Sequence, residues 1–309
     1  MRVIFLILPQ VEIMDLAGPL QVFHEANRHG ARFETLCCAM EPEVSTEQGL
    51  WLGRLAPLPE PQKSDIVLVP GGPVATHMKA PNAILDWLRK AARANARVGS
   101  VCTGAFVLGA AGLLDGRSCT THWSRIEDLR RRFPKAHILE DRLYVMDGPV
   151  FTSAGIASGI DVALALVEAE CGPNIASLAA REMVVYLRRD GSHRQQSVYL
   201  DYRNHINQGV HRVQDWLSAH PEHAATLPEL AQIAGMSVRS LTRQFREATG
   251  LSVNAFTKKV RLERAQDLLC DPGLTLEVVA ERCGFQDARQ LRRIWREAYG
   301  KPPSASRPR

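Results

Sequence analysis

The sequence predicts an α/β domain with a mostly parallel sheet, followed by an all-α domain. Two observations predict this order: short apolar runs alternate with helical patterns in the first part of the chain, and one helical module occurs twice in the last third. Between them, the polar segment 188–197 lacks apolar periodicity and is typical of a linker. We therefore expect domains at 1–189 and 206–309, joined by a linker at 190–205.

Length and composition limit the class of protein. A chain of 309 residues can bury two cores, and 45% hydrophobic with 23% charged residues is typical of a soluble globular protein. The apolar run at residues 3–8 is too short for a membrane span or a signal peptide, so we expect a cytoplasmic chain with no membrane partner. The 7 cysteines lack zinc-type spacing, which predicts free thiols and no metal or other cofactor.

Positive charge is concentrated in the last third of the chain. Residues 206–309 contain 16 Lys and Arg against 11 Asp and Glu, whereas residues 1–205 contain 22 of each, so the formal net charge of +5 belongs to the back part. A neutral front and a basic back are typical of a chain whose back part contacts a polyanion.

Two kinds of pattern predict the elements of the front domain. Apolar runs bounded by polar residues or proline indicate strands covered on both faces, and apolar residues at a helical period indicate helices. Asp147 and Gly148 indicate a hairpin turn, and Gly172 ends the last helix. In chain order, we expect strands at 2–8 and 65–70, a helix at 82–94, a strand at 97–101, a helix at 104–114, the hairpin at 142–153 and a helix at 159–172. Such alternation favours a mostly parallel sheet with helices on both sides.

The back domain contains an internal repeat. "TLPELAQIAGMS" begins at Thr226 and "TLEVVAERCGFQ" begins at Thr275, and both fit T-L-x-x-x-A-x-x-x-G-[MF]. Each copy then reaches "REATG" or "REAYG", which end at Gly250 and Gly300. The repeated unit predicts one helical module that is present twice.

Each copy has the pattern of a helix-turn-helix motif. An apolar-faced helix is followed by Gly235 or Gly284, which permits the positive φ of a tight turn, and then by a helix with a polar face. The amphipathic segment 253–269 between the copies predicts a linker helix that would hold the two motifs about 34 Å apart on one face of DNA. The basic residues expected on the outer face of this helix are Lys258, Lys259, Arg261 and Arg264.

The second helix of such a motif enters the DNA major groove. Arginine can bind guanine, glutamine can bind adenine, and hydroxyl groups can bind phosphates. Helical repeats with basic faces also occur as plain scaffolds, which is the alternative interpretation. The candidate DNA-binding residues are Ser237, Arg239, Ser240, Thr242 and Arg243 in the first copy and Gln286, Arg289, Gln290, Arg292 and Arg293 in the second.

Cys102 marks a candidate site in the front domain. It lies between a strand and a helix, where a sharp elbow exposes the sulfur and the helix N-terminus favours the thiolate. Asp15 follows the first strand at the same end of the sheet, where ligand sites of α/β folds lie. The amides of Gly71 and Gly72 are expected to be free to face an oxyanion, and His122 is a further candidate.

Each of these residues also has a purely structural interpretation. Cys102 fits a small buried residue at a tight turn, His122 fits a structural histidine, and Asp15 fits a cap of a helix that begins near Ala17. The candidate ligand-binding residues are Asp15, Gly72, Cys102, Thr103 and His122, and the candidate catalytic residues are Cys102 and Asp15.

The front domain resembles the PfpI-type, class I glutamine-amidotransferase-like proteins. The resemblance rests on "DLAGPLQVF", "VPGG", "SVCTGAFVLGAAGLLDG", "TTHW" and "TSAGIASGID", and several of these stretches also resemble isocyanide hydratase. It implies a flavodoxin-like parallel-sheet sandwich, with Cys102 as nucleophile and Asp15 as its acidic partner. The protease-like members have histidine directly after the cysteine, where this chain has Thr103.

The segment from about residue 210 to 307 resembles an AraC-family DNA-binding domain. "RLERAQDLL" matches the linker helix, and "IAGMSVRSLTRQFREATG" and "VAERCGFQDARQLRRIWREAYGKPPSASR" match the two motifs. The chain departs from the family pattern at Val253, where proline is common, at Trp295, where phenylalanine is usual, and at Ser306, where the family has tyrosine.

The order of the two domains is similar to that of the GlxA-type AraC-family regulators. This resemblance implies a front domain that binds a small effector, an amino acid or a quaternary amine. The leading hypothesis is a transcription regulator rather than an enzyme, which acts as a homodimer on promoter DNA. Two alternatives remain: a cysteine-dependent hydratase or amidase with a DNA-binding appendage, and a redox sensor in which Cys102 is oxidised.

Overall fold

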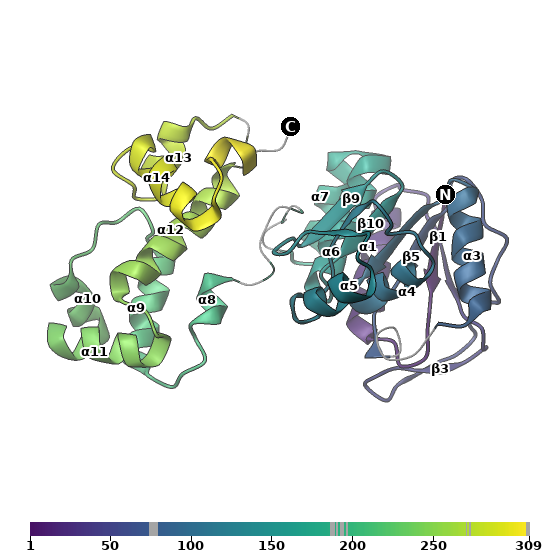
Figure 1. Ribbon diagram of the computed structural model, residues 1–309, viewed down its shortest axis with the longest axis horizontal. Helices are drawn as coiled ribbons and strands as arrows, with labels where there is room; N and C mark the ends of the chain where they lie inside the picture. The colour runs from purple at the N-terminus through teal and green to yellow at the C-terminus, as the bar shows by residue number, and fades with distance from the viewer. Residues whose placement is uncertain are drawn as a thin grey trace. The chain divides into compact units, whose positions relative to one another are not determined.

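The computed structural model describes residues 1–73, 80–185, 189, 191, 195, 197–269, 271 and 273–306. The chain forms two compact units, Met1–Gln195 and Gln196–Arg309 (Figure 1). Helix α8, Val198–Asp201, lies inside the segment expected to be a linker, and its Val198 is buried in a hydrophobic core of the second unit. The domain limits at 189 and 206 stay predictions.

A six-stranded sheet forms the centre of the first unit. Its strands are β1 (Arg2–Leu6), β2 (Glu34–Cys38), β5 (Ile66–Val69), β6 (Arg97–Val101), β9 (Tyr144–Asp147) and β10 (Val150–Ser153). They lie in the order β2-β1-β5-β6-β10-β9, and all neighbours are parallel except β10 and β9. These last two form the predicted hairpin, in which Gly148 has a φ of 60°. The predicted flavodoxin-like, mostly parallel fold is confirmed.

Helices cover both faces of this sheet. They are α1 (Ile13–Arg28), α3 (Asn82–Arg93), α4 (Ala105–Ala110), α5 (Ile126–Arg132), α6 (Ala157–Cys171) and α7 (Pro173–Glu182). Alternate strand residues point to opposite faces, so Phe5 belongs to the hydrophobic core that includes residues of α1, α6 and α7, while Ile4 belongs to the core that includes residues of α3 and α4. Helix α1 begins at Ile13, four residues before the expected Ala17.

Short elements connect these layers. They are β3 (Val44–Ser45) with β4 (Trp51–Leu52), β7 (Ser118–Cys119) with β8 (His137–Ile138), and the 3-10 turns η1 (Cys102–Gly104) and η2 (Trp123–Arg125). Turn η1 directly follows β6, so the strand passes into helix α4 through Cys102.

The second unit contains the two predicted helix-turn-helix motifs. Its helices after α8 are α9 (Gln208–Ala219), α10 (Leu227–Ala234), α11 (Val238–Thr249), α12 (Val253–Leu269), α13 (Leu276–Arg282) and α14 (Ala288–Tyr299), followed by the turn η3 (Pro303–Ser306). The first half of α12 packs in the core of α9, α10 and α11, and its second half packs in the core of α13 and α14. Helix α12 is therefore the predicted linker helix, shared by both motifs.

The residues that the two copies of the repeat share have structural roles. Thr226 and Thr275 are the N-caps of α10 and α13, and each side chain accepts a hydrogen bond from the third residue after it. Gly235 has a φ of 69° and Gly284 a φ of 74°, which glycine adopts without steric cost. The repeat thus encodes the start of one helix and the turn into the next.

Candidate functional sites

The second helix of each motif is strongly amphipathic. Leu241 and Phe245 anchor α11 in its core, and Leu291 and Trp295 occupy the equivalent positions of α14. The opposite faces remain exposed because their residues are polar or charged. Each motif therefore presents one polar helical face to solvent.

The candidate DNA-binding residues fall into two groups. Seven have exposed side chains that cap no helix, and these are Arg239, Thr242, Arg243, Gln286, Arg289, Arg292 and Arg293. The other three take part in the structure of the motif. Ser237 is the N-cap of α11 and accepts a hydrogen bond from the amide of Ser240 at 3.2 Å. The Gln290 Oε1 atom accepts a hydrogen bond from the amide of Gln286 at 2.8 Å.

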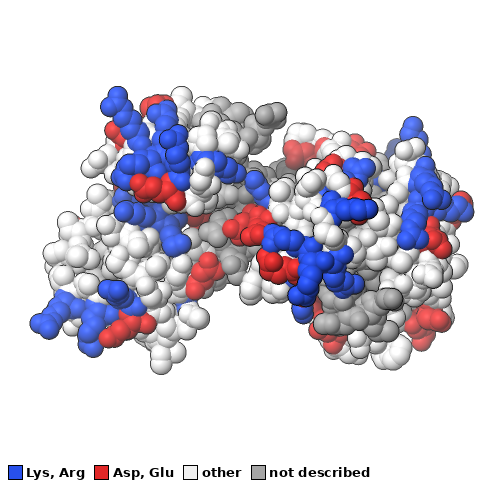
Figure 2. Space-filling view, viewed as in Figure 1, with Lys and Arg blue, Asp and Glu red and all other residues white. Residues whose placement is uncertain are grey.

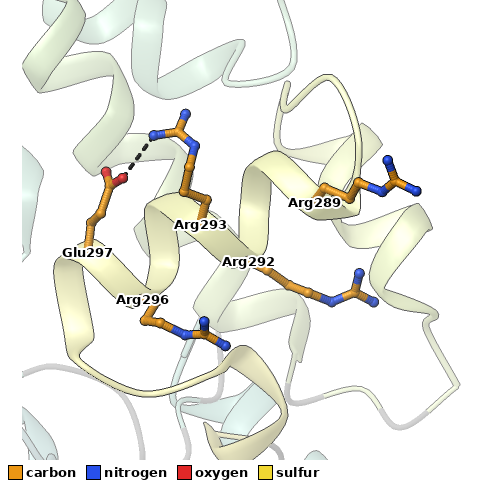
Figure 3. A pocket seen from close by; sticks show the side chains of 5 residues that line it. All are labelled: Arg289, Arg292, Arg293, Arg296 and Glu297. Carbon is orange, nitrogen blue, oxygen red and sulfur yellow. Dashed lines mark hydrogen bonds and ion pairs between the residues drawn. The ribbon is translucent and has the colours of Figure 1, made fainter.

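Helix α14 carries a row of four arginines. Arg289, Arg292, Arg293 and Arg296 line a surface pocket together with Glu297 (Figure 3). Three of them extend on the same side of the helix, whereas Arg293 turns toward Glu297 and donates to its Oε1 at 2.8 Å. Sequence reasoning missed Arg296, although its spacing from Arg289 and Arg292 is that of one helical face.

The first motif repeats the arginine–glutamate pair. On α11, Arg243 lies 3.6 Å from Glu247, at the positions equivalent to Arg293 and Glu297. In Figure 2, Lys and Arg side chains gather over the parts of the second unit where Figure 1 shows α11 and α14. Exposed ion pairs of this kind contribute at most about 1 kcal/mol, so a phosphate or a base can replace the glutamate as partner.

A contact between the motifs involves Arg261, which was expected on the outer face of the linker helix. This expectation is wrong in part: Arg261 is half-buried and donates to the carbonyl oxygens of Pro221 at 2.8 Å and His223 at 3.0 Å. Burial lowers the pKa of its guanidinium from its ordinary value. A Cβ on Gly284 would lie 2.4 Å from the Pro221 oxygen. The turn of the second motif therefore packs directly against the first.

In the first unit, Cys102 has the backbone of a sharp elbow. Its φ is 56°, in the left-handed region that non-glycine residues rarely adopt. Gly155 makes room for the thiol, because a Cβ there would lie 2.8 Å from the Cys102 Sγ atom. The strand-to-helix elbow thus depends on a second loop, which follows β10.

Asp15 connects three loops at this end of the sheet. It is fully buried in the first turn of α1, and its carboxylate accepts hydrogen bonds from the amides of Gly71 at 3.1 Å and Ile156 at 2.7 Å. The Cys102 thiol is a further hydrogen-bond partner. Burial raises the pKa of Asp15 to about 6. Glu12, rather than Asp15, is the N-cap of α1.

The surroundings of Cys102 keep its thiol protonated. Burial and, secondly, the charge of Asp15 raise the pKa of Cys102 well above its ordinary value. These two effects outweigh the elbow geometry, which by itself would favour a thiolate. A protonated thiol is a poor nucleophile and reacts slowly with peroxide. Burial and the charge of Asp15 therefore disfavour a catalytic or redox role of Cys102 at neutral pH.

The expected oxyanion donors are not free. The amide of Gly71 donates to Asp15, and the amide of Gly72 donates to the Thr103 Oγ1 atom at 2.8 Å. The Thr103 hydroxyl in turn donates to the Gly72 carbonyl at 3.0 Å. The expectation of free amides is wrong because side chains distant in sequence accept both hydrogen bonds.

His122 lies in the same region but has another partner. Its Nδ1 atom is 2.8 Å from the Ser124 hydroxyl, and its side chain caps η2. Burial, and then the nearby Arg125, lower the pKa of this imidazole. His122 is therefore neutral at pH 7.

These residues surround a small cavity of about 220 Å³. Its lining consists of Glu12, Glu47, Gly72, Pro73, Cys102, Thr103, His122, Ser124, Arg125 and Ile156. Four of the five candidate ligand-binding residues therefore line this cavity. The fifth, Asp15, does not line it but accepts a hydrogen bond from the amide of Ile156, which does. Glu12 and Arg125 each lie three residues from a candidate and could have been found from that proximity. No pattern in the sequence indicated that Glu47 would line this cavity.

Two features are absent from the part of the chain that the structure describes. No group of three or more His, Cys, Asp or Glu residues there could hold a metal ion. None of the helices described is both long enough and apolar enough to cross a membrane.

Comparisons with known proteins match both units. The DJ-1/PfpI family model matches residues 1–169, and a helix-turn-helix domain model matches residues 230–309. The transcriptional regulator CdhR from Pseudomonas aeruginosa is 31% identical over 98% of this chain and 90% of its own length. GlxA from Rhizobium meliloti is 25% identical over 100% of this chain and 96% of its own length.

An enzyme also resembles the front unit. Isonitrile hydratase from Pseudomonas putida is 36% identical over 58% of this chain and 76% of its own length. The regulators, in contrast, match both units. The chain therefore belongs to the DJ-1/PfpI family and, with its C-terminal helix-turn-helix domain, to the GlxA-type HTH transcriptional regulators.

Proposed function

We propose that this chain regulates transcription by binding double-stranded DNA through α11 and α14, under the control of a small metabolite in the front cavity. The observation that carries the proposal is the doubled polar helix, with exposed arginines at equivalent positions: Arg239 with Arg289, Arg243 with Arg293. An enzyme that acts on a small substrate has no use for such a pair. The two helices share α12, so they can contact one duplex together.

We assign different roles to the arginines along each helix. The first turns of a recognition helix contact base edges, so Arg289 and Arg293 are suited to guanine and Arg239 and Arg243 act likewise in the first motif. Arg296 lies one turn further along α14, where phosphate contacts are expected. Base contacts supply specificity, and phosphate contacts supply affinity that falls with salt.

Fluorescence anisotropy of the full-length chain tests these roles. The labelled duplexes are the region upstream of its own gene and a scrambled duplex of equal length. Arg293→Ala should weaken specific binding by about tenfold or more and random binding much less, as loss of about 1–3 kcal/mol at one base implies. Arg54→Ala, which removes an exposed arginine of the first unit, is the matched control. Equal losses on both duplexes would make Arg293 a phosphate contact only.

For the effector, the cavity favours a small zwitterion. Glu12 and Glu47 offer negative charge to an amine or quaternary ammonium group, and Arg125 offers positive charge to a carboxylate. At about 220 Å³ the cavity is smaller than the roughly 300–1,000 Å³ of drug-sized sites, which suits an amino acid or a betaine.

Thermal unfolding of the full chain tests the effector class. The panel is the standard amino acids and glycine betaine, and a binder raises the melting temperature by mass action. Glu47→Gln should weaken the effect of a zwitterion but not that of an uncharged isostere. Stabilisation by uncharged compounds alone would contradict the proposal.

The hydratase or amidase alternative is tested with Cys102→Ser. We expect this variant to keep its DNA response and expect no turnover of isonitriles or amides by either form, because the thiol is protonated and the Gly71 and Gly72 amides are engaged. Turnover that disappears in the variant would favour an enzyme.

We also propose that the regulator acts as a homodimer in the cytoplasm, where bacterial promoter DNA lies. A dimer would place two such pairs of helices on two half-sites of one promoter, which raises its affinity for that DNA. Light scattering of the purified chain should give twice the 34.2 kDa mass of one chain. A monomer mass with and without DNA would contradict the dimer.

A further inference from the structure

Two described residues near the end of the first unit form hydrogen bonds to segments that adjoin the effector cavity, and a third packs against the sheet. We infer that Arg189, Gly191 and Gln195, which we call the tether, transmit the state of this cavity to the DNA-binding unit. This inference rests on the proposed function, because it names the route of regulation. Its support comes from contacts of the tether within the first unit.

Gln195 provides the first link. Its half-buried amide donates from Nε2 to the carbonyl oxygen of Thr121 at 2.9 Å and to the Thr120 hydroxyl at 3.2 Å. Thr121 is fully buried, and its hydroxyl donates to the carbonyl oxygen of Cys102 at 2.8 Å. The residue after Thr121 is His122, which lines the cavity. Hydrogen bonds through Thr121 therefore join Cys102 to the last residue of the first unit.

Arg189 provides the second link, through helix α6. Its Nη2 atom donates to the Asp161 carboxylate at 2.6 Å, and the Asp161 side chain is only 3% exposed. Asp161 lies on α6, which begins directly after Ile156. Ile156 lines the cavity and donates its amide to Asp15. A second wall of the cavity is thus coupled to the tether.

Between these links, Gly191 holds the tether close to the sheet. A Cβ on Gly191 would lie 2.3 Å from the carbonyl oxygen of Tyr144 in β9. Any larger residue must therefore shift the backbone of the tether or of the strand. The absence of a side chain at Gly191 is what permits this close approach.

The two links make the tether sensitive to movements of the cavity walls. Thr121 and α6 are buried, so a ligand that favours one position of either wall also favours one position of Gln195 or Arg189. Gln196 begins the second unit, directly after Gln195. By reciprocity, DNA that favours one state of the tether changes the affinity of the cavity for its ligand.

A double-mutant cycle tests the link without ligand or DNA. Thr121→Val removes the hydrogen bond to Cys102 at nearly constant volume, and Gln195→Ala removes the connection to the tether. The readout is hydrogen–deuterium exchange of residues 197–205 in the full-length chain. Thr121→Val should speed this exchange by about fivefold in the wild-type background and leave it unchanged in the Gln195→Ala background.

Three further variants sharpen the test. Thr121→Ser keeps the hydroxyl and should restore wild-type exchange. Gly191→Ala displaces the tether without touching the cavity, so it should remove the effect of Thr121→Val as Gln195→Ala does. Gln21→Ala deletes an amide that donates to Glu25 on α1 and should change nothing in residues 197–205.

Two results would overturn the inference. One is an exchange rate at residues 197–205 that Thr121→Val does not change. The other is an equal change of this rate by Thr121→Val in the wild-type and Gln195→Ala backgrounds. Either result would leave Gln195 and Arg189 as structural anchors only. Because the cycle uses neither DNA nor effector, its failure is separate from a failure of the proposed function, which the binding assays report.

Discussion

Replacing Asp15 with asparagine should change the pH dependence of stability of the first unit. Asp15 is fully buried, and burial raises its pKa from 3.8 to about 6. The folded state therefore holds a proton on this group more tightly than the unfolded state does. Between these two pKa values the unfolded state binds fewer protons, so stability falls as pH rises, by about 3 kcal/mol in all.

The asparagine variant lacks this titration but has a hydrogen-bonding defect. The side-chain oxygen of the asparagine can accept the hydrogen bond from the backbone amide of Ile156. Its side-chain NH2 group, however, then faces the backbone amide of Gly71, so two donors meet and one remains unpaired. Such a defect costs about 1–3 kcal/mol at every pH. Asp15→Asn should therefore be less stable than the wild type at about pH 4 and equal or more stable at about pH 7.5, because only the wild type loses about 3 kcal/mol in between.

Urea unfolding of the full-length chain measures this difference. Trp216 and Trp295 are replaced by phenylalanine in both proteins, so the fluorescence of Trp51, Trp87 and Trp123 reports the first unit alone. Parallel stability profiles of the two proteins from about pH 4 to about pH 7.5 would refute the reasoning, because they would show that Asp15 titrates no differently in the folded and unfolded states.

Three predictions concern the second unit. The indole N–H of Trp295 is buried without a hydrogen-bond partner among the residues that the structure describes, so Trp295→Phe should change the free energy of unfolding by less than about 1 kcal/mol in urea titrations, whereas Trp295→Ala should cost about 3–5 kcal/mol. A large loss in the phenylalanine variant would show that the N–H has a partner. Gly284→Ala should lower the melting temperature more than Gly300→Ala, because both residues have positive φ but only at Gly284 would a Cβ meet the Pro221 oxygen, at 2.4 Å; equal shifts would contradict this packing. Arg261→Ala should weaken binding to a two-part DNA site by about tenfold, through loss of two hydrogen bonds that fix the motifs relative to each other, while the salt dependence of binding stays the same. A shallower salt dependence in anisotropy titrations would instead make Arg261 a phosphate contact.

Much of the fold could be predicted from the sequence because local patterns encode it. Buried parallel strands such as β1 and β5 are continuous apolar runs, and the caps Thr226 and Thr275 repeat with the helices that they begin. The short strands β3, β4, β7 and β8 were missed, because two residues are too few for a periodic pattern.

The sites could be predicted only in part. Cys102, Thr103 and His122 were found from the elbow and its neighbours, and the structure brings them to one cavity. The free amides of Gly71 and Gly72 were predicted wrongly, because their acceptors Asp15 and Thr103 lie 56 and 31 residues away. No local pattern reports such tertiary hydrogen bonds. Arg261 of α12 was misplaced for the same reason, since its acceptors Pro221 and His223 lie in the loop between α9 and α10.

Hydroxyl-radical footprinting of the full-length chain on the duplex upstream of its own gene tests the central claim most directly. We predict two protected windows on one face of the DNA, about 10 base pairs apart, because the proposal places α11 and α14 in successive major grooves. Arg243→Ala should weaken one window and Arg293→Ala the other. A single window, or no protection of any duplex at low ionic strength, would contradict the account.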